Sequence, residues 1–293
     1  MEDLQHTPYH FWQPAACLRV TGEDALTFLQ GQVTNNLAEL IVDHTVYGLL
    51  LNQKGKVLAD CFVGRVGQEE FLVVSYHSKA EDIRERLEAY IIADDVTITD
   101  ETDQSRGVTF FTEADHWEVI SHLPGGYLFP GRRTSGSHWE WIAPEVQLEE
   151  ISPSLHQDLQ LTNEEMERRR IAAKIPAIPQ DIGLGELPNE GGLDRDAISY
   201  TKGCYLGQEV MARLKAMGQV RRQLLPLNAT APLPTLPAPL FAGEKQVGEL
   251  RSAVATPEGF DGLALITLMH VPADRKLALT VSGPSVVTLQ NPA

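Results

Sequence analysis

Short apolar runs separated by polar connections dominate the first hundred residues. The runs at 46–51 and 57–66 flank Asn52-Gln53-Lys54-Gly55-Lys56, a glycine-containing connection of hairpin length. This arrangement predicts a β-hairpin. A further apolar run covers residues 71–75, and another lies near 96–99. We expect both to be strands.

Three segments carry helical signals instead. Residues 23–34 place two acids in a first turn and follow them with apolar residues at helical spacing, which predicts a helix. Ser78-Lys79-Ala80-Glu81 fits a capping box, with apolar residues on one helical face after it. Thr162 to Glu165 fits a second capping box, before a helix that should end near Lys174.

Strands that wrap around one helix through hairpin connections indicate an α+β fold. We expect a ferredoxin-like α/β sandwich over about residues 46–120. Further short strands are expected at 107–112, 117–121, 127–130 and 138–142.

Proline and glycine divide the second half of the chain. Residues 175–199 contain Pro176, Pro179 and Pro188 together with several glycines, so they should form a long loop, and we expect it to line a binding cleft. Residues 226–239 are proline-dense and predict an extended linker. Short apolar runs at barrel-like spacing follow it. The expected organisation is therefore a region 1–225, a linker 226–239 and a C-terminal β-barrel 240–293.

The net charge of the chain disfavours some classes of binding partner. The chain has 24 basic and 40 acidic side chains, a formal net charge of −16. Such a charge repels phosphate backbones and anionic lipids, so direct non-specific binding of nucleic acid is not expected. The chain has no apolar stretch of membrane-spanning length, and its first residues lack the features of a signal peptide. We therefore expect a cytoplasmic protein.

Cysteine and histidine spacing argues against a built-in metal site. Cys17, Cys61 and Cys204 lie far apart and form no CxxC pair. Four thiolates are the usual ligands of an iron–sulfur cluster, so this chain alone would hold one only transiently. The nine histidines show no regular ligand spacing either.

The segment from Lys202 to Glu209, with Arg213 after it, concentrates reactive, flexible and charged residues. It reads Lys-Gly-Cys-Tyr-Leu-Gly-Gln-Glu, and a helix is expected from Gly207 onward. If Lys202 to Cys204 is extended, the ammonium and the thiol share a face. The cation and the helix N-terminus would both favour a thiolate. The alternative is that Cys204 is a small buried hydrophobe.

This signature segment resembles that of the YgfZ family, the folate-binding relatives of the glycine cleavage T-protein. Members carry Lys-Gly-Cys-aromatic-x-Gly-Gln-Glu and a basic residue four positions on, and this chain fills every position. Three further segments resemble the family in order along the chain, namely 22–35, 52–60 and 187–190. The resemblance implies a T-protein-like fold, with an inserted ferredoxin-like sandwich and a small C-terminal barrel.

The resemblance also implies a function. It implies binding of tetrahydrofolate or a derivative and support for iron–sulfur cluster assembly or repair in client enzymes, including enzymes that thiolate tRNA. Cys204 is then the residue that the family needs most, and we expect Lys202 to assist it. A transient iron–sulfur species is a further expected ligand.

A folate site needs a carboxylate or amide for the pterin, an aromatic or apolar cover and a cation for the glutamate tail. The candidates are Asp60, Tyr205, Gln208, Glu209 and Arg213. Asp60 resembles one of a pair of acids that includes the T-protein catalytic aspartate, but Ala59 breaks the pair. Four of these residues also have a possible structural role without a ligand. Asp60 could be a solvated side chain, Tyr205 a core residue, and Glu209 with Arg213 a helix-stabilising pair.

Three functions remain open. The leading hypothesis is the folate-binding accessory factor with a reactive Cys204. The alternative is a tetrahydrofolate-dependent one-carbon (aminomethyl) transferase, for which Asp60 would be essential. The third is a binding module with a vestigial cleft.

Overall fold

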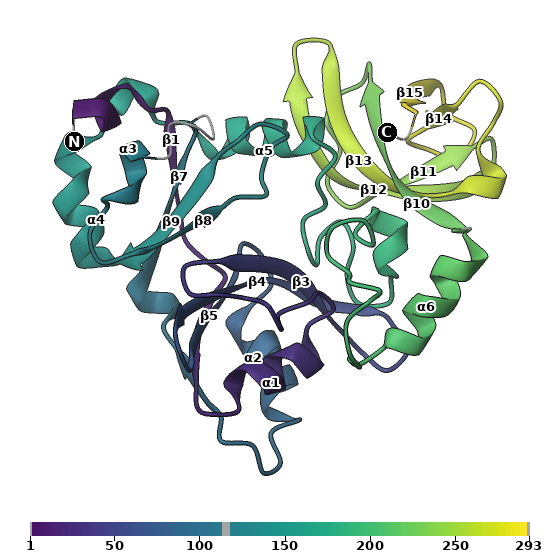
Figure 1. Ribbon diagram of the computed structural model, residues 1–293. Helices are drawn as coiled ribbons and strands as arrows, with labels where there is room; N and C mark the ends of the chain where they lie inside the picture. Colours follow the sequence, from purple (N-terminus) through teal and green to yellow (C-terminus); the bar gives the residue numbers. More distant parts are fainter. Residues whose placement is uncertain (1, 113–117, 219, 292–293) are drawn as a thin grey trace.

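The computed structural model, which describes residues 2–112, 118–218 and 220–291, has three lobes (Figure 1), and a central cavity lies between two of them. One lobe is an antiparallel sheet with strand order β3-β4-β5-β2-β6. Its strands are β2 (Ala16–Thr21), β3 (Thr45–Leu51), β4 (Val57–Gly67), β5 (Glu70–Ser75) and β6 (Thr97–Asp100). Helices α1 (Ala25–Gln32) and α2 (Ala80–Glu88) pack on one face. The predicted hairpin is therefore confirmed.

Successive side chains of β4 point to opposite faces of the sheet, and this determines which of them reach the cavity. Ala59, Cys61 and Val63 are buried in the core beneath α1 and α2. Because successive side chains of a strand point to opposite faces, Asp60 and Phe62 lie on the other face. Phe62 packs there against the second lobe.

The second lobe is a sheet with strand order β1-β7-β9-β8. Its strands are β1 (Tyr9–Trp12), β7 (Ser105–Phe110), β8 (Tyr127–Pro130) and β9 (Trp139–Pro144), and its helices are α3 (Glu118–Ser121) and α4 (Glu145–Ile151). Between the two sheets, Trp12, Phe62 and Phe129 belong to one shared cluster of buried residues. The two sheets thus meet across a common core.

Six strands close the third lobe into a barrel in the order β10-β13-β12-β11-β14-β15. They are β10 (Arg222–Ala229), β11 (Ala238–Ala242), β12 (Lys245–Thr256), β13 (Gly259–Thr267), β14 (Lys276–Ala278) and β15 (Ser285–Leu289). The predicted barrel is confirmed, but its predicted start is wrong. Leu227 and Ala229 are buried in the barrel core, so the proline-dense segment begins with a barrel strand and does not form a linker from 226 to 239.

Helix α5 (Asn163–Ala172) and helix α6 (Gln208–Met217) join the second lobe to the barrel. Thr162 caps α5 as predicted, since its hydroxyl accepts a hydrogen bond from the Glu165 amide at 3.2 Å. The long loop between the two helices has a single short helical turn, η6 (Pro188–Gly191). Other 3-10 turns among the described residues are η1 (Glu2–His6), η2 (Thr102–Gln104), η4 (Ser152–Ser154), η5 (Gln157–Leu159) and η7 (Leu268–His270). Within the described ranges, no helix is long and apolar enough to cross a bilayer.

Three local expectations are wrong. The α/β sandwich spans β2 to β6 and not residues 46–120, because β7 pairs with β1 in the other sheet. Residues 118–121 are helix α3 where a strand over 117–121 was expected, and residue 117 lies outside the described residues. Ser78 does not cap α2, because its hydroxyl donates to Asp60 at 2.6 Å.

Candidate functional site

A cavity of about 310 Å³ lies where both sheets meet α5. Its lining is rich in aromatic, cationic and carboxylate side chains. From the first lobe come Tyr47, Asp60, Tyr76 and His77, from the second His10, Arg132 and Arg133, and from α5 and its C-terminal side Asn163, Met166, Glu167, Arg170, Ile175 and Pro176. A volume of this size suits a small organic ligand.

Asp60 is the carboxylate held most firmly in this cavity. Its side chain is 5% exposed, so the reading as a solvated residue is wrong. Oδ1 accepts hydrogen bonds from the Ser75 hydroxyl at 2.9 Å and the Ser78 hydroxyl at 2.6 Å, and Oδ2 accepts one from the Tyr47 hydroxyl at 3.0 Å. A carboxylate offers about four acceptor positions, so about one remains for a ligand. The three hydroxyls fix the direction in which it points.

Two consecutive arginines supply positive charge beside aromatic rings. The Arg132 guanidinium lies 4.5 Å from the ring centroid of Tyr47 and donates to Asp196 at 2.9 Å. The Arg133 guanidinium lies 3.7 Å from the centroid of Tyr76 and pairs with Glu140 at 3.0 Å. Its Nη2 is buried and has no hydrogen-bond partner among the described residues. A buried donor of this kind favours an acceptor supplied by a ligand.

Burial shifts the titration of several groups that line the cavity. It raises the pKa of Tyr47, and the nearby Asp60 carboxylate raises it further, so the phenol stays protonated and can donate to Asp60. Burial and Glu140 likewise raise the pKa of Tyr76. Burial lowers the pKa of His10, whose Nδ1 lies 2.9 Å from the Leu161 carbonyl oxygen, and Arg133 lowers it further. His10 is therefore neutral at pH 7.

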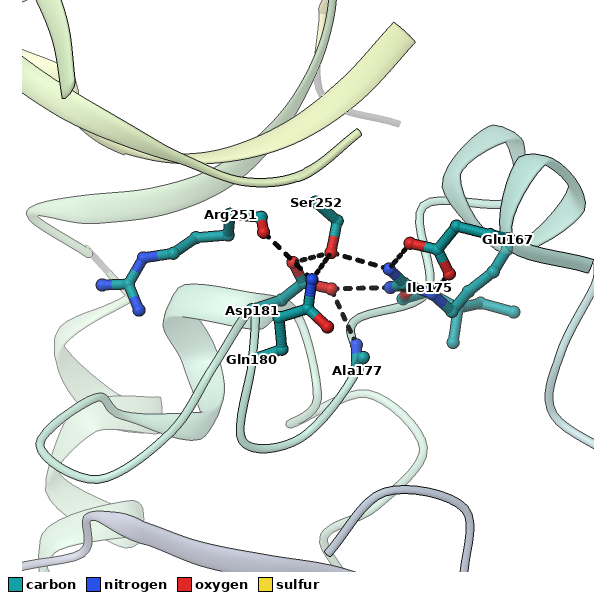
Figure 2. Close-up of polar contacts among 8 residues, drawn as sticks. Glu167, Ile175, Ala177, Gln180, Asp181, Arg251 and Ser252 are labelled. Atoms are coloured by element: carbon teal, nitrogen blue, oxygen red, sulfur yellow. Dashed lines mark hydrogen bonds and ion pairs between the residues drawn. The ribbon is translucent and has the colours of Figure 1, made fainter. Parts of the chain in front are cut away.

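A buried polar network fixes the α5 wall of the cavity to the barrel (Figure 2). Arg170 donates to Asp181 at 2.6 Å and to Ser252 of β12 at 2.8 Å. Ser252 in turn donates to Asp181 at 2.6 Å, and the Ala177 amide donates to the same carboxylate at 2.8 Å. The network joins α5, the long loop and the barrel at one point.

The signature segment divides its reactive side chains between the surface and the interior of the protein. Cys204 is exposed, so the reading as a buried hydrophobe is wrong. Lys202 is 8% exposed, and residues 201–203 form bends and not a strand. The expected common face for the ammonium and the thiol is therefore not formed. Burial lowers the pKa of Lys202 to about 8, which leaves the amine largely protonated at pH 7.

Helix α6 begins where predicted, and Gly207 is the residue that makes this start possible. Its φ is 87°, a conformation that L side chains rarely adopt. A Cβ at this position would lie 2.9 Å from the carbonyl oxygen of Asn52 and 3.2 Å from the Cα of Gly55. The signature segment is thus packed directly against the tip of the β3-β4 hairpin.

The other predicted site residues do not join Asp60. None of Cys204, Tyr205, Gln208, Glu209 and Arg213 is among the described residues that line the cavity. Tyr205 is 7% exposed and packs in the core between the hairpin and the long loop. Glu209 and Arg213 are exposed, and no ion pair joins these two described side chains. The Cys204 thiol therefore does not belong to the cavity that contains Asp60.

Sequence reasoning missed most of the cavity. It did not identify Tyr47, Tyr76, Arg132, Arg133 or Arg170. The pair Arg132-Arg133 begins two residues after the end of β8 at Pro130, which is a usable signal, since residues in loops beside strand ends often line sites. The expectation that the long loop lines a cleft holds at its start, where Ile175 and Pro176 line the cavity.

The cavity residues fit a folate. Asp60 offers an acceptor for pterin N–H groups, Tyr47 and Tyr76 offer aromatic surface, and Arg133 offers an unpartnered donor for a carboxylate. These are the three chemical requirements stated above. By contrast, the described residues contain no group of three or more metal-ligating side chains that could hold an ion.

Comparisons with known proteins agree with this architecture. Residues 14–110 match the family described as the GCVT N-terminal domain, and residues 221–293 match the CAF17 C-terminal beta-barrel domain. The chain is 26% identical to the human mitochondrial iron–sulfur cluster assembly factor IBA57, over 91% of this chain and 82% of that protein. It is 28% identical to the tRNA-modifying protein YgfZ of Photobacterium profundum, over 71% of this chain and 65% of that protein.

Aminomethyltransferases share the fold at lower identity. The chain is 22% identical to the aminomethyltransferase of Bacillus cytotoxicus, over 90% of this chain and 80% of that protein. The crystal structure of the glycine cleavage aminomethyltransferase T from Bartonella henselae superposes with a TM-score of 0.81 at 15% identity, covering 99% of this chain and 87% of that one. The fold is therefore that of a glycine cleavage T-protein.

Proposed function

Because the chain belongs to the YgfZ and CAF17 family of T-protein-like proteins, we propose that it is a folate-binding accessory factor for iron–sulfur proteins. It would support assembly or repair of clusters in client enzymes, including enzymes that thiolate tRNA. Cys204 would supply the working thiol, and tetrahydrofolate or a derivative would occupy the central cavity. The observation that carries the proposal is the exposed Cys204 in an intact signature segment.

The distribution of the three thiols supports this role for Cys204. Cys17 and Cys61 are both buried, and burial raises the pKa of each. Cys204 is the exposed one of the three. One accessible cysteine cannot supply the usual four ligands of a cluster, so a cluster would be cargo shared with a partner protein or a small thiol.

The cavity supports the folate part of the proposal. Asp60 would orient the pterin, the rings of Tyr47 and Tyr76 would cover it, and Arg133 would bind a carboxylate. The cavity lies away from the signature segment. Folate would therefore act on the conformation of the protein or on a client, and not as a direct reactant of Cys204.

Complementation combined with calorimetry tests the proposal. Cys204→Ala should leave tetrahydrofolate binding intact but fail to restore iron–sulfur enzyme activity in a deletion strain. Asp60→Asn should weaken binding about tenfold or more, since a charge-assisted hydrogen bond contributes about 1.5 to 3 kcal/mol. Full rescue by Cys204→Ala would reject the role of the thiol. Absence of folate binding, with a stable client complex, would favour the binding module.

The aminomethyltransferase alternative rests on the shared fold and on Asp60. Ala59 is buried in the core beneath the helices, so the broken acid pair does not alter the cavity itself. Turnover of a one-carbon folate that is lost in Asp60→Asn and kept in Cys204→Ala would favour this alternative.

A further inference from the structure

The ammonium group of Lys202 is enclosed by three backbone carbonyl oxygens. Its Nζ donates to Gln30 at 2.5 Å, to Val33 at 2.6 Å and to Asn35 at 2.8 Å. A lysine ammonium has three N–H donors, so its donor capacity is fully used. No carboxylate pairs with it among the described residues. The cage lies at the C-terminal end of α1, where unpaired carbonyls attract a cation.

The segment that forms this cage is itself tied to a strand that lines the cavity. The side-chain amide of Asn35 donates to the carbonyl oxygens of Tyr47 at 2.8 Å and Asp196 at 2.9 Å. Tyr47 is the β3 residue that donates to Asp60. Asn35 therefore connects the backbone of Tyr47 to the ammonium of Lys202, two residues before Cys204.

The same segment has a second attachment, through Thr34. Its hydroxyl donates to the Ala197 carbonyl oxygen at 2.6 Å and accepts from the Leu49 amide at 2.8 Å. Its own carbonyl oxygen accepts from the Ser199 amide at 3.1 Å. Residues 33–35 thus hold both β3 and the chain that enters the signature segment.

We propose that Lys202 is a positioning residue, which fixes the signature segment to residues 30–35 and so holds the Cys204 thiol at a constant place on the surface. It does not act as the charge partner of the thiol. This inference rests on the proposed function only in taking Cys204 as the working thiol. The evidence is the enclosed ammonium, its use of all three donors and the opposite exposure of Lys202 and Cys204.

The pH dependence of Cys204 alkylation by iodoacetamide separates positioning from charge pairing. In Lys202→Met the midpoint of the rate against pH should stay within a few tenths of a unit of the wild-type value. Amide hydrogen exchange over residues 200–206 should instead accelerate about tenfold or more, since the anchoring hydrogen bonds are lost. Complementation should be lost as well. Lys245→Met is the matched control, because it removes an exposed ammonium from barrel strand β12. It should change none of these readouts.

A rise of the alkylation midpoint by about half a pH unit or more in Lys202→Met, with unchanged exchange, would overturn the inference. Asn35→Ala provides a second test if Lys202→Met does not fold. It removes the side-chain ties but keeps the Lys202 charge and the backbone carbonyl, so exchange should rise and the midpoint should not move. Unchanged exchange in Asn35→Ala would equally count against the inference. Full rescue by Cys204→Ala would instead reject the proposed function and leave these exchange results interpretable.

Discussion

Arg170 and Asp181 form an ion pair of 2.6 Å in which the side chains are 7% and 0% exposed. Arg170 lines the central cavity, whereas Asp181 lies in the long loop and contacts barrel residue Ser252. The pair therefore joins helix α5 to the long loop, and Asp181 connects both to the barrel.

We predict that Asp181→Ala destabilises the protein by about 3 to 5 kcal/mol, because it removes the buried acceptor shared by Arg170, the Ala177 amide and the Ser252 hydroxyl, although Glu167 still pairs with the guanidinium. Urea unfolding followed by tryptophan fluorescence measures this loss. Glu164→Ala, which breaks the exposed pair with Arg168 on the same helix, should cost about 1 kcal/mol or less. Equal losses in the two variants would contradict the structural role of the buried pair.

The two glycines of the signature segment should respond differently to alanine. Gly207→Ala places a Cβ 2.9 Å from a carbonyl oxygen at a positive φ, so we expect a loss of about 1 to 3 kcal/mol. Gly203→Ala meets no atom within 4 Å and has no positive φ, so its unfolding midpoint should stay close to wild type. Thermal unfolding compares them, and a Gly203→Ala loss as large as that of Gly207→Ala would argue against this backbone geometry.

Acidification should weaken the fold through His10. Its pKa is lowered in the folded state, so below the ordinary value of about 6.5 the unfolded chain binds a proton that the folded chain does not. The free energy of unfolding should therefore fall as the pH drops below that value. Asn at this position keeps a donor for the Leu161 carbonyl without a titrating ring. His10→Asn should show a shallower fall between pH 6.5 and 5, and identical slopes would exclude His10 as the cause.

Thiol labelling should distinguish the three cysteines. Iodoacetamide should modify Cys204 in the native protein, and Cys17 and Cys61 only after unfolding. Burial raises the pKa of Cys17 to about 11, which reduces its thiolate about a hundredfold relative to its ordinary value. Mass spectrometry of the peptides gives the result, and Cys204→Ala should remain unlabelled in native buffer. Rapid native labelling of Cys61 would contradict its burial.

Local patterns predicted most strands because the decisive information lies within each strand. Residues 57–66 place Ala59, Cys61 and Val63 on one face, and a period of two is visible in sequence. The pairing of Tyr9 with Phe110 is not visible in this way, because it joins residues about a hundred positions apart. The barrel strand at 222–229 was missed because Pro226 and the prolines that follow the strand suggested a linker, although Leu227 and Ala229 alternate into the core.

In the candidate site, too, local features could be predicted from the sequence and contacts between distant residues could not. Cys204 and Asp60 stand out in the sequence, because a thiol between glycines and an acid after a hairpin are local features. The burial of Lys202 could not be predicted, because the carbonyl oxygens that enclose its ammonium belong to the backbone and do not depend on residue identity. Ser78 was assigned to a helix cap for a similar reason, since its hydroxyl had a distant acceptor in Asp60.

The strands of one sheet flank those of the other along the sequence, and this order has a consequence for folding during synthesis on the ribosome. Strand β1 precedes the whole five-stranded sheet in sequence, yet its partner β7 follows that sheet. The sheet of β2 to β6 can form as soon as these strands have been synthesised. The backbone N–H and C=O groups of β1 stay unpaired until β7 has also been synthesised. An unpaired apolar strand is a template for association with other chains. We therefore expect residues 9–12 to be a segment that a chaperone protects during translation.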